Sequence, residues 1–213
     1  MEPIIDVQDV TKSFKNATVL SHISVSFEKG KIHGIIGRNG SGKTVLIKTI
    51  CGLIHPDQGK VIVDGKVIGK EVDFPESLGA IIEAPGFLPT ASAYRNLSYL
   101  ASLRGRVGKE EICAAISFVG LDPGDKKPVG KYSLGMKQRL GLAQAIMENP
   151  DILLLDEPMN GLDNDGVAEM REYLQQLRGN GKTILLVSHS LEDIHTLCDT
   201  VHEMDHGVMT RKK

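Results

Sequence analysis

Apolar positions along the 213-residue chain follow two patterns. Near the beginning, apolar and polar residues alternate over 4–10 and again over 19–27, which predicts two half-buried strands paired antiparallel. Residues 32–36, 152–155 and 183–187 form short, mainly apolar runs instead. Because strands covered on both faces carry such runs, the second pattern predicts a parallel sheet with helices on both sides.

Further short elements surround these strands. Asp64-Gly65-Lys66 separates two short apolar runs and predicts a hairpin, and Asp205-His206-Gly207 does the same near the end of the chain. Helical spacing follows two of the apolar strands. The remaining predicted strands are 61–63, 67–68, 78–82, 201–204 and 208–211, and the helices after the apolar strands are 165–177 and 191–198.

The character of the chain changes between residues 85 and 149. Apolar residues recur there with helical spacing in three segments, and proline and glycine interrupt the pattern between the second and the third. We predict that 85–149 is a mostly helical insertion in an α/β core made of 1–84 and 150–213. The predicted helices of the insertion are 94–103, 109–119 and 135–147.

The composition narrows the class of protein. A hydrophobic fraction of 41% and a charged fraction of 24% are ordinary for a soluble globular protein. The net charge of −2 provides no basic field, so no nucleic-acid partner is expected. No apolar run approaches the roughly 20 residues that span a bilayer, and the first residues lack a signal-peptide pattern. Three cysteines far apart indicate reduced thiols of a cytosolic protein.

Residues 37–44, Gly-Arg-Asn-Gly-Ser-Gly-Lys-Thr, are the most informative segment. They stand between a predicted strand and a helical pattern, the context that a phosphate-binding loop requires. The glycines permit positive φ angles that turn backbone N–H groups toward one point, and the helix N-terminus adds partial positive charge. Lys43 is expected at the outer phosphates and Thr44 at Mg²⁺. A glycine-rich surface turn is the alternative, but the flanking elements favour a nucleoside triphosphate site.

Two acids follow the apolar run 152–155. Asp156 and Glu157 stand at the carboxyl end of a buried strand, where ligands of parallel α/β sheets bind. Asp156 is expected to hold Mg²⁺, and Glu157 to polarise the attacking water. An Asp-Glu pair alone indicates only a solvated strand end. In the same chain as the glycine loop, the pair predicts hydrolysis of a nucleoside triphosphate.

Further residues complete a family pattern. Phe14 precedes the glycine loop, Asn160-Gly161-Leu162-Asp163 follows the two acids, and His189 follows the next strand. With these motifs the chain resembles, from end to end, the nucleotide-binding subunit of an ABC transporter. The resemblance implies an α/β P-loop NTPase (RecA-like) core with a mostly parallel sheet, an antiparallel β subdomain and an inserted helical subdomain. It also implies that 1–213 is a single ABC ATPase domain.

The chain departs from the family pattern in two places. Where the family has Leu-Ser-Gly-Gly-Gln, residues 132–136 read Tyr-Ser-Leu-Gly-Met, which keeps Ser133 and Gly135 but replaces a glycine by Leu134. Glu83 stands where the family normally has a glutamine that touches Mg²⁺, and an ionised carboxylate cannot donate a hydrogen bond. These departures resemble the subgroup that exports, or confers immunity to, bacitracin-like and lantibiotic peptides.

The resemblance implies ATP and Mg²⁺ as cofactors. The implied catalytic residues are Glu157, His189, which steadies the γ-phosphate, and Lys43. The implied metal ligands are Thr44, Asp156 and Glu83. The implied nucleotide-binding residues are Phe14, whose ring stacks on adenine, Thr18, Gly37, Asn39, Gly40, Ser41, Gly42, Lys43, Thr44, Ser133 and Gly135.

The resemblance also implies partners. A second ATPase subunit, in a homo- or heterodimer, places each ATP between the glycine loop of one chain and the Ser133 helix of the other. A separate transmembrane permease holds the chain at the cytoplasmic face of the cell membrane. The expected function is ATP-driven export of antimicrobial peptides, lipids or drugs. Two alternatives stay open: a soluble ABC-type ATPase in translation or DNA repair, and a regulatory ATPase that uses ATP to switch shape.

Overall fold

The computed structural model describes residues 3–15, 17–83 and 86–213. Its smaller sheet has four strands in the order β2-β1-β4-β5, and each pair of neighbours is antiparallel. The alternating segments near the beginning of the chain therefore pair as predicted. The strands are β1 (Ile5–Phe14), β2 (Ala17–Phe27), β4 (Gln58–Val63) and β5 (Lys66–Val67).

The larger sheet has six strands in the order β10-β9-β3-β8-β7-β6. Neighbours from β9 to β6 are parallel, and only the edge strand β10 is antiparallel to its neighbour β9. Parallel pairing brings the carboxyl ends of β3 and β7 to one edge, which is where the candidate site lies. The strands are β3 (Ile32–Ile36), β6 (Leu78–Ile81), β7 (Ile152–Asp156), β8 (Thr183–Val187), β9 (Thr200–Asp205) and β10 (Val208–Arg211).

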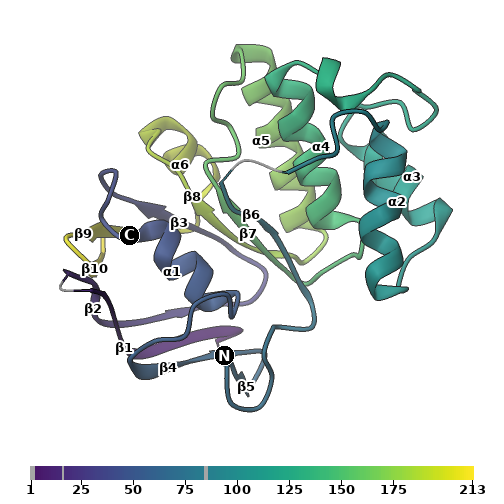
Figure 1. Ribbon diagram of the computed structural model, residues 1–213. Helices are drawn as coiled ribbons and strands as arrows, with labels where there is room; N and C mark the ends of the chain where they lie inside the picture. Colours follow the sequence, from purple (N-terminus) through teal and green to yellow (C-terminus); the bar gives the residue numbers. More distant parts are fainter. Residues whose placement is uncertain (1–2, 16, 84–85) are drawn as a thin grey trace.

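Helix α1 (Lys43–Ile50) lies between the two sheets (Figure 1). Its apolar residues join one buried cluster with the small sheet and with one face of the large sheet, to which Leu154 belongs. The alternate residues Leu153 and Leu155 face the other way, into a second cluster formed with the remaining helices. The large sheet is therefore covered on both faces, which explains the uninterrupted apolar runs of β7 and β8.

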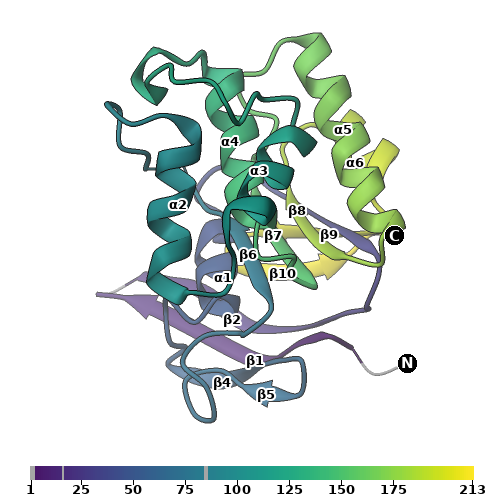
Figure 2. The same cartoon turned by 90° about the vertical axis from the view of Figure 1, so that its right-hand side faces the viewer.

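The other helices pack together on the far side of the large sheet (Figure 2). Gly79 of β6 allows close packing there, because a Cβ at that position would lie 1.9 Å from the Ala145 carbonyl oxygen. Four of the helices begin at a Ser or Asp whose side chain accepts a backbone N–H. The helices are α2 (Ala93–Arg104), α3 (Lys109–Phe118), α4 (Leu134–Ile146), α5 (Asn164–Gly179) and α6 (Leu191–Leu197), with a 3₁₀ turn at Val129–Lys131.

The α/β fold class is confirmed, and the predicted elements are present with small shifts at their ends. The hairpin strand predicted at 67–68 ends at Val67, because Ile68 forms only an isolated bridge with Val72. The predicted boundary between residues 84 and 85 lies outside the described residues, and the division into core and insertion stays a prediction. Among the described residues, no helix has the length and apolar character needed to cross a bilayer.

The three cysteines are free thiols. Burial raises the pKa of both Cys51 and Cys198 to about 12, so neither forms a thiolate near neutral pH. These two side chains therefore act as core residues.

Candidate nucleotide site

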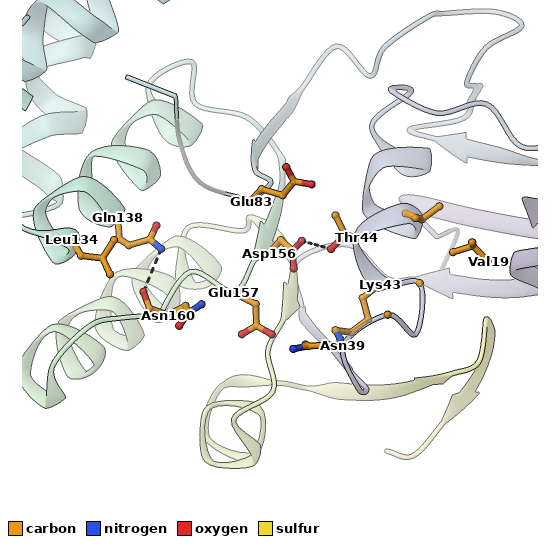
Figure 3. Close-up of a pocket in the computed structure, with 13 residues that line it drawn as sticks. Val19, Asn39, Lys43, Thr44, Glu83, Leu134, Gln138, Asp156, Glu157 and Asn160 are labelled. Atoms are coloured by element: carbon orange, nitrogen blue, oxygen red, sulfur yellow. Dashed lines mark hydrogen bonds between the residues drawn. The ribbon is translucent and has the colours of Figure 1, made fainter. Parts of the chain in front are cut away.

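A pocket of about 600 Å³ opens at the carboxyl edge of the large sheet (Figure 3). The glycine loop and α1 form one side of it, and the beginning of α4 forms the other. The end of β7 lies between the two sides. The lining residues are Val19, Asn39, Gly40, Gly42, Lys43, Thr44, Val45, Glu83, Leu134, Gln138, Asp156, Glu157 and Asn160.

The glycine loop has the conformation that its sequence predicts. Gly37, Gly40 and Gly42 have φ angles of 150°, 79° and 107°, which side chains disfavour. Gly37 is also restricted sterically, because a Cβ there would lie 2.2 Å from the carbonyl oxygen of Met204 on β9. Glycine at this position is therefore required by the contact of the loop with the sheet.

Lys43 and Ser41 present buried polar atoms within this loop. The Lys43 ammonium donates to the carbonyl oxygens of Gly37 and Arg38, at 2.8 and 3.0 Å. The Ser41 hydroxyl is buried and has no hydrogen-bond partner in the part of the chain that the structure describes. A buried hydroxyl and a buried ammonium within a loop of left-handed glycines fit the oxygens of a phosphate group.

Thr44 and Asp156 meet at the base of the pocket. The Thr44 hydroxyl donates to Asp156 Oδ2 at 2.7 Å (Figure 3), although the two residues are far apart in the sequence. Hydroxyl and carboxylate oxygens are hard ligands of the kind that Mg²⁺ prefers, and Mg²⁺ is commonly held by one or two carboxylates together with substrate phosphates. The donor set therefore fits Mg²⁺ bound with a nucleotide.

Glu157 has a backbone conformation that is unusual for a side-chain-bearing residue. Its φ angle is 52°, and its N–H donates to the carbonyl oxygen of Val187 on β8. Its carboxylate lies 2.8 Å from Nδ1 of His189. The neighbouring strands β7 and β8 thus bring Glu157, predicted to polarise the attacking water, into direct contact with His189, predicted to steady the γ-phosphate. The sequence alone gave no indication of this hydrogen bond.

Glu83 also lines the pocket and has a positive φ angle of 60°. Its carboxylate forms an ion pair with the Lys48 ammonium at 2.6 Å. Lys48 was not among the predicted site residues. Its spacing could have indicated that it lies near the site, because Lys48 is one helical turn after Thr44 and therefore on the same face of α1.

The beginning of α4 forms the opposite side of the pocket. Ser133 caps this helix, and its hydroxyl accepts the Met136 N–H at 3.2 Å. Leu134 packs closely on Gly161, where an added Cβ would lie 2.1 Å from Leu134 Cδ2. Gln138 donates weakly to the Asn160 carbonyl oxygen at 3.4 Å. Leu134, Gln138 and Asn160 line the pocket, and none of them was among the predicted site residues.

The hairpin of β1 and β2 carries two further predicted residues. Phe14 is 43% exposed, with the Lys12 ammonium 5.5 Å from its ring centroid. The Thr18 hydroxyl shares a hydrogen bond with that of Ser13. Val19, the next residue along β2, lines the pocket. The predicted site residues that are not among the lining residues are Phe14, Thr18, Gly37, Ser41, Ser133, Gly135 and His189, and their contacts with nucleotide stay predictions.

Comparisons with known proteins agree with this geometry. A family model described as ABC transporter matches residues 20–160. The ABC transporter ATP-binding protein YybJ of Bacillus subtilis, whose function is uncharacterized, is 47% identical over 96% of this chain and 94% of its own length. The bacitracin transport ATP-binding protein BcrA of Enterococcus faecalis is 43% identical over 97% of this chain and 68% of its own length.

The lantibiotic transport ATP-binding protein SrtF of Streptococcus pyogenes is 35% identical, over 99% of this chain and 90% of SrtF. Among solved structures, the dimeric bacterial ABC transporter cassette MJ0796 is similar in fold, with a TM-score of 0.88, 21% identity and coverage of 98% of both chains. The expected similarity to the bacitracin and lantibiotic subgroup is therefore confirmed.

A glycine loop between a parallel strand and a helix, with a pocket at the carboxyl edge of the sheet, defines a P-loop nucleoside triphosphatase. The chain belongs to the ABC transporter family. It is an ATP-binding subunit of this family and an ATPase, and its cofactors are ATP and Mg²⁺.

Proposed function

We propose that this chain powers the export of antimicrobial peptides, at the cytoplasmic face of the membrane and together with a separate permease. Support comes from BcrA and SrtF, which are named for bacitracin and lantibiotic transport and are similar over nearly the whole of this chain. The departures at Leu134 and Glu83 also resemble the pattern of this subgroup.

The observation that carries the ATPase mechanism is the hydrogen bond between Thr44 and Asp156 beside the buried Lys43. In our proposal, Lys43 and the N–H groups of the loop bind the outer phosphates, and the Ser41 hydroxyl donates to a phosphate oxygen. Thr44, Asp156 and Glu83 hold Mg²⁺. When bound, the metal ion neutralises charge that develops on the phosphates.

Glu157 is the general base in this proposal. It accepts a proton from the water that attacks the γ-phosphate, and its backbone hydrogen bond to Val187 holds the main chain from which the carboxylate extends. His189 orients the carboxylate through the 2.8 Å contact and steadies the phosphate during hydrolysis. The left-handed backbone of Glu157 is consistent with a functional constraint at this position.

A second cassette completes the site. Ser133 and Gly135 lie at the N-terminus of α4, and neither lines the pocket of its own chain. We propose that they bind the phosphates held by another subunit, with ATP closing the dimer and hydrolysis reopening it. Phe14 stacks on adenine beside Thr18. The helical segment 85–149 forms a subdomain that passes this cycle to the permease.

One experiment separates transport from the alternatives. The tagged chain is purified from detergent-solubilised membranes of its own host, and the proteins recovered in stoichiometric amount are identified by mass spectrometry. A multi-span membrane protein supports the transporter function, whereas ribosomes or soluble proteins alone contradict it. Loss of bacitracin or lantibiotic resistance on deletion, restored by the wild-type chain and not by Lys43→Ala, tests the substrate class.

A further inference from the structure

The ion pair between Lys48 and Glu83 joins two elements that flank the pocket. Lys48 belongs to the last turn of α1, and Glu83 follows β6. Their side chains are 29% and 65% exposed, with the ammonium and the carboxylate 2.6 Å apart. The pair therefore connects the phosphate-loop helix to the strand that leads toward the helical segment.

Helix geometry sets the place of Lys48. Residues four apart on an α-helix share a face, so Lys48 lies one turn beyond Thr44 on the side of α1 that meets Asp156. The Thr44 hydroxyl donates to Asp156, while the Lys48 ammonium holds Glu83. Figure 3 draws no hydrogen bond from the Glu83 carboxylate to either Thr44 or Asp156.

The charges around the pocket explain why Glu83 needs a counter-charge. Glu83, Asp156 and Glu157 bring three carboxylates to its lining, and like charges this close to one another repel. A glutamine at position 83 would add no charge and would need no ionic partner. The carboxylate is a hard oxygen ligand for Mg²⁺ and also binds the Lys48 ammonium, so the two cations compete for it.

We propose that Lys48 is a positioning residue that holds the Glu83 carboxylate in an ion pair with which Mg²⁺ must compete. When Mg²⁺ and ATP bind, Glu83 exchanges the ion pair for the metal ion, and the direct link between α1 and the segment after β6 is released. This inference rests on the proposed role of Glu83 as a metal ligand. It assigns to the Lys48 ammonium the control of how readily Glu83 reaches the metal ion.

The test is a Mg²⁺ titration of binding of a fluorescent, non-hydrolysable ATP analogue. Lys48→Met keeps the apolar stem and removes the charge, so it should lower the half-saturating Mg²⁺ concentration about two- to fivefold, as expected for a partly exposed ion pair. Lys48→Arg should stay near wild type. In a Glu83→Gln background, Lys48→Met should have no effect. Lys66→Met, which breaks a comparable ion pair with Glu76 far from the pocket, is the matched control.

Each other outcome overturns a definite part of the proposal. An unchanged midpoint in Lys48→Met shows that Lys48 does not compete for Glu83. An equal shift in the wild-type and Glu83→Gln backgrounds shows that Lys48 acts only as a nearby charge. If the wild-type chain fails to bind the analogue at any Mg²⁺ concentration, the proposed nucleotide site fails, and the role of Lys48 fails with it.

Discussion

The two walls of the nucleotide pocket are built in different ways. One, the phosphate wall, consists of residues 37–44, and we group with it Asp156 and Glu157 at the end of β7, which lies between the two sides. It is shaped by backbone conformation, with three left-handed glycines and a loop seated on β9. The other, the signature wall, consists of Glu83, Leu134, Gln138 and Asn160, and its shape depends on side chains and their tertiary partners. Both departures from the family pattern lie at the signature wall.

The difference shows where substitution is tolerated. A side chain at Gly37 would collide with the backbone of Met204, which no rotamer change can relieve. Leu134 and Glu83 instead meet partners that accommodate them, namely Gly161 and Lys48. The glycine loop of the phosphate wall is thus restricted by backbone contacts, whereas side-chain contacts accommodate the two departures at the signature wall.

The largest expected effect is loss of turnover at the phosphate wall. Glu157→Gln should lower kcat for ATP hydrolysis by about 10²- to 10³-fold, because the amide cannot accept the proton of the attacking water. ATP binding should be retained. Steady-state phosphate release measures the effect, with Glu110→Gln on the exposed side of α3 as the control. Undiminished hydrolysis would remove Glu157 from the role of general base.

A smaller effect is expected on the affinity for ATP. Lys43→Ala should weaken ATP binding about 10- to 100-fold, the range expected for losing charge-assisted hydrogen bonds to phosphate. Fluorescence titration with an ATP analogue measures the dissociation constant, and a thermal melt verifies that the variant is folded. Lys60→Ala on β4 is the control. A dissociation constant equal to that of the wild-type chain would show that Lys43 does not contact the nucleotide.

Acid should weaken the sheet that supports the phosphate wall. Burial lowers the pKa of His202 on β9 to about 4, and the charges of His33 and Arg211 add to this effect. Burial also lowers the pKa of His33, which hydrogen-bonds Thr200 and the Glu28 carbonyl oxygen. Both values lie below the unfolded pKa of about 6.5, so the unfolded chain binds more protons as the pH falls below that value.

The contribution of the neutral His202 and His33 side chains to the unfolding free energy is therefore complete above about pH 6.5. It is lost progressively toward pH 4. For His202 the loss between pH 7.5 and 5 should be about 2 kcal/mol of unfolding free energy. Urea unfolding at both pH values measures it. His202→Leu should flatten the pH dependence, whereas His206→Asn in the exposed turn should not. Equal pH dependence in wild type and His202→Leu would contradict the assignment.

The smallest effect concerns the signature wall. Gly161→Ala should destabilise the chain by about 1–2 kcal/mol, because its φ angle is 75° and the new methyl group would meet Leu134. Gly65→Ala is a matched control, since Gly65 has the same φ angle and open space around it. Urea unfolding should show a larger loss of unfolding free energy for Gly161→Ala than for Gly65→Ala. In a Leu134→Ala background the two losses should be equal. Equal losses with Leu134 in place would show that the Leu134 contact is unimportant.

The difference between the phosphate wall and the signature wall also explains what could be predicted from the sequence. The parallel sheet follows from uninterrupted apolar runs such as Ile152–Leu155. The glycine loop follows from glycines placed between a strand and a helix. The contacts of the signature wall could not be predicted in this way. Helical spacing places Lys48 on the face of Thr44, but only tertiary packing brings it to Glu83 and brings Leu134 to Gly161. The hydrogen bond between Glu157 and His189 likewise depends on the pairing of β7 with β8.

We propose that the phosphate wall of one chain and the Ser133 helix of another complete a single ATP site. Light scattering of Glu157→Gln, purified and supplied with Mg²⁺ and either ATP or ADP, measures whether two chains join. We expect a mass of two chains with ATP and of one chain with ADP. When Ser133→Arg is added, we expect one chain with ATP, although that variant still binds nucleotide. A single-chain mass for Glu157→Gln saturated with ATP would show that the two chains do not share the site.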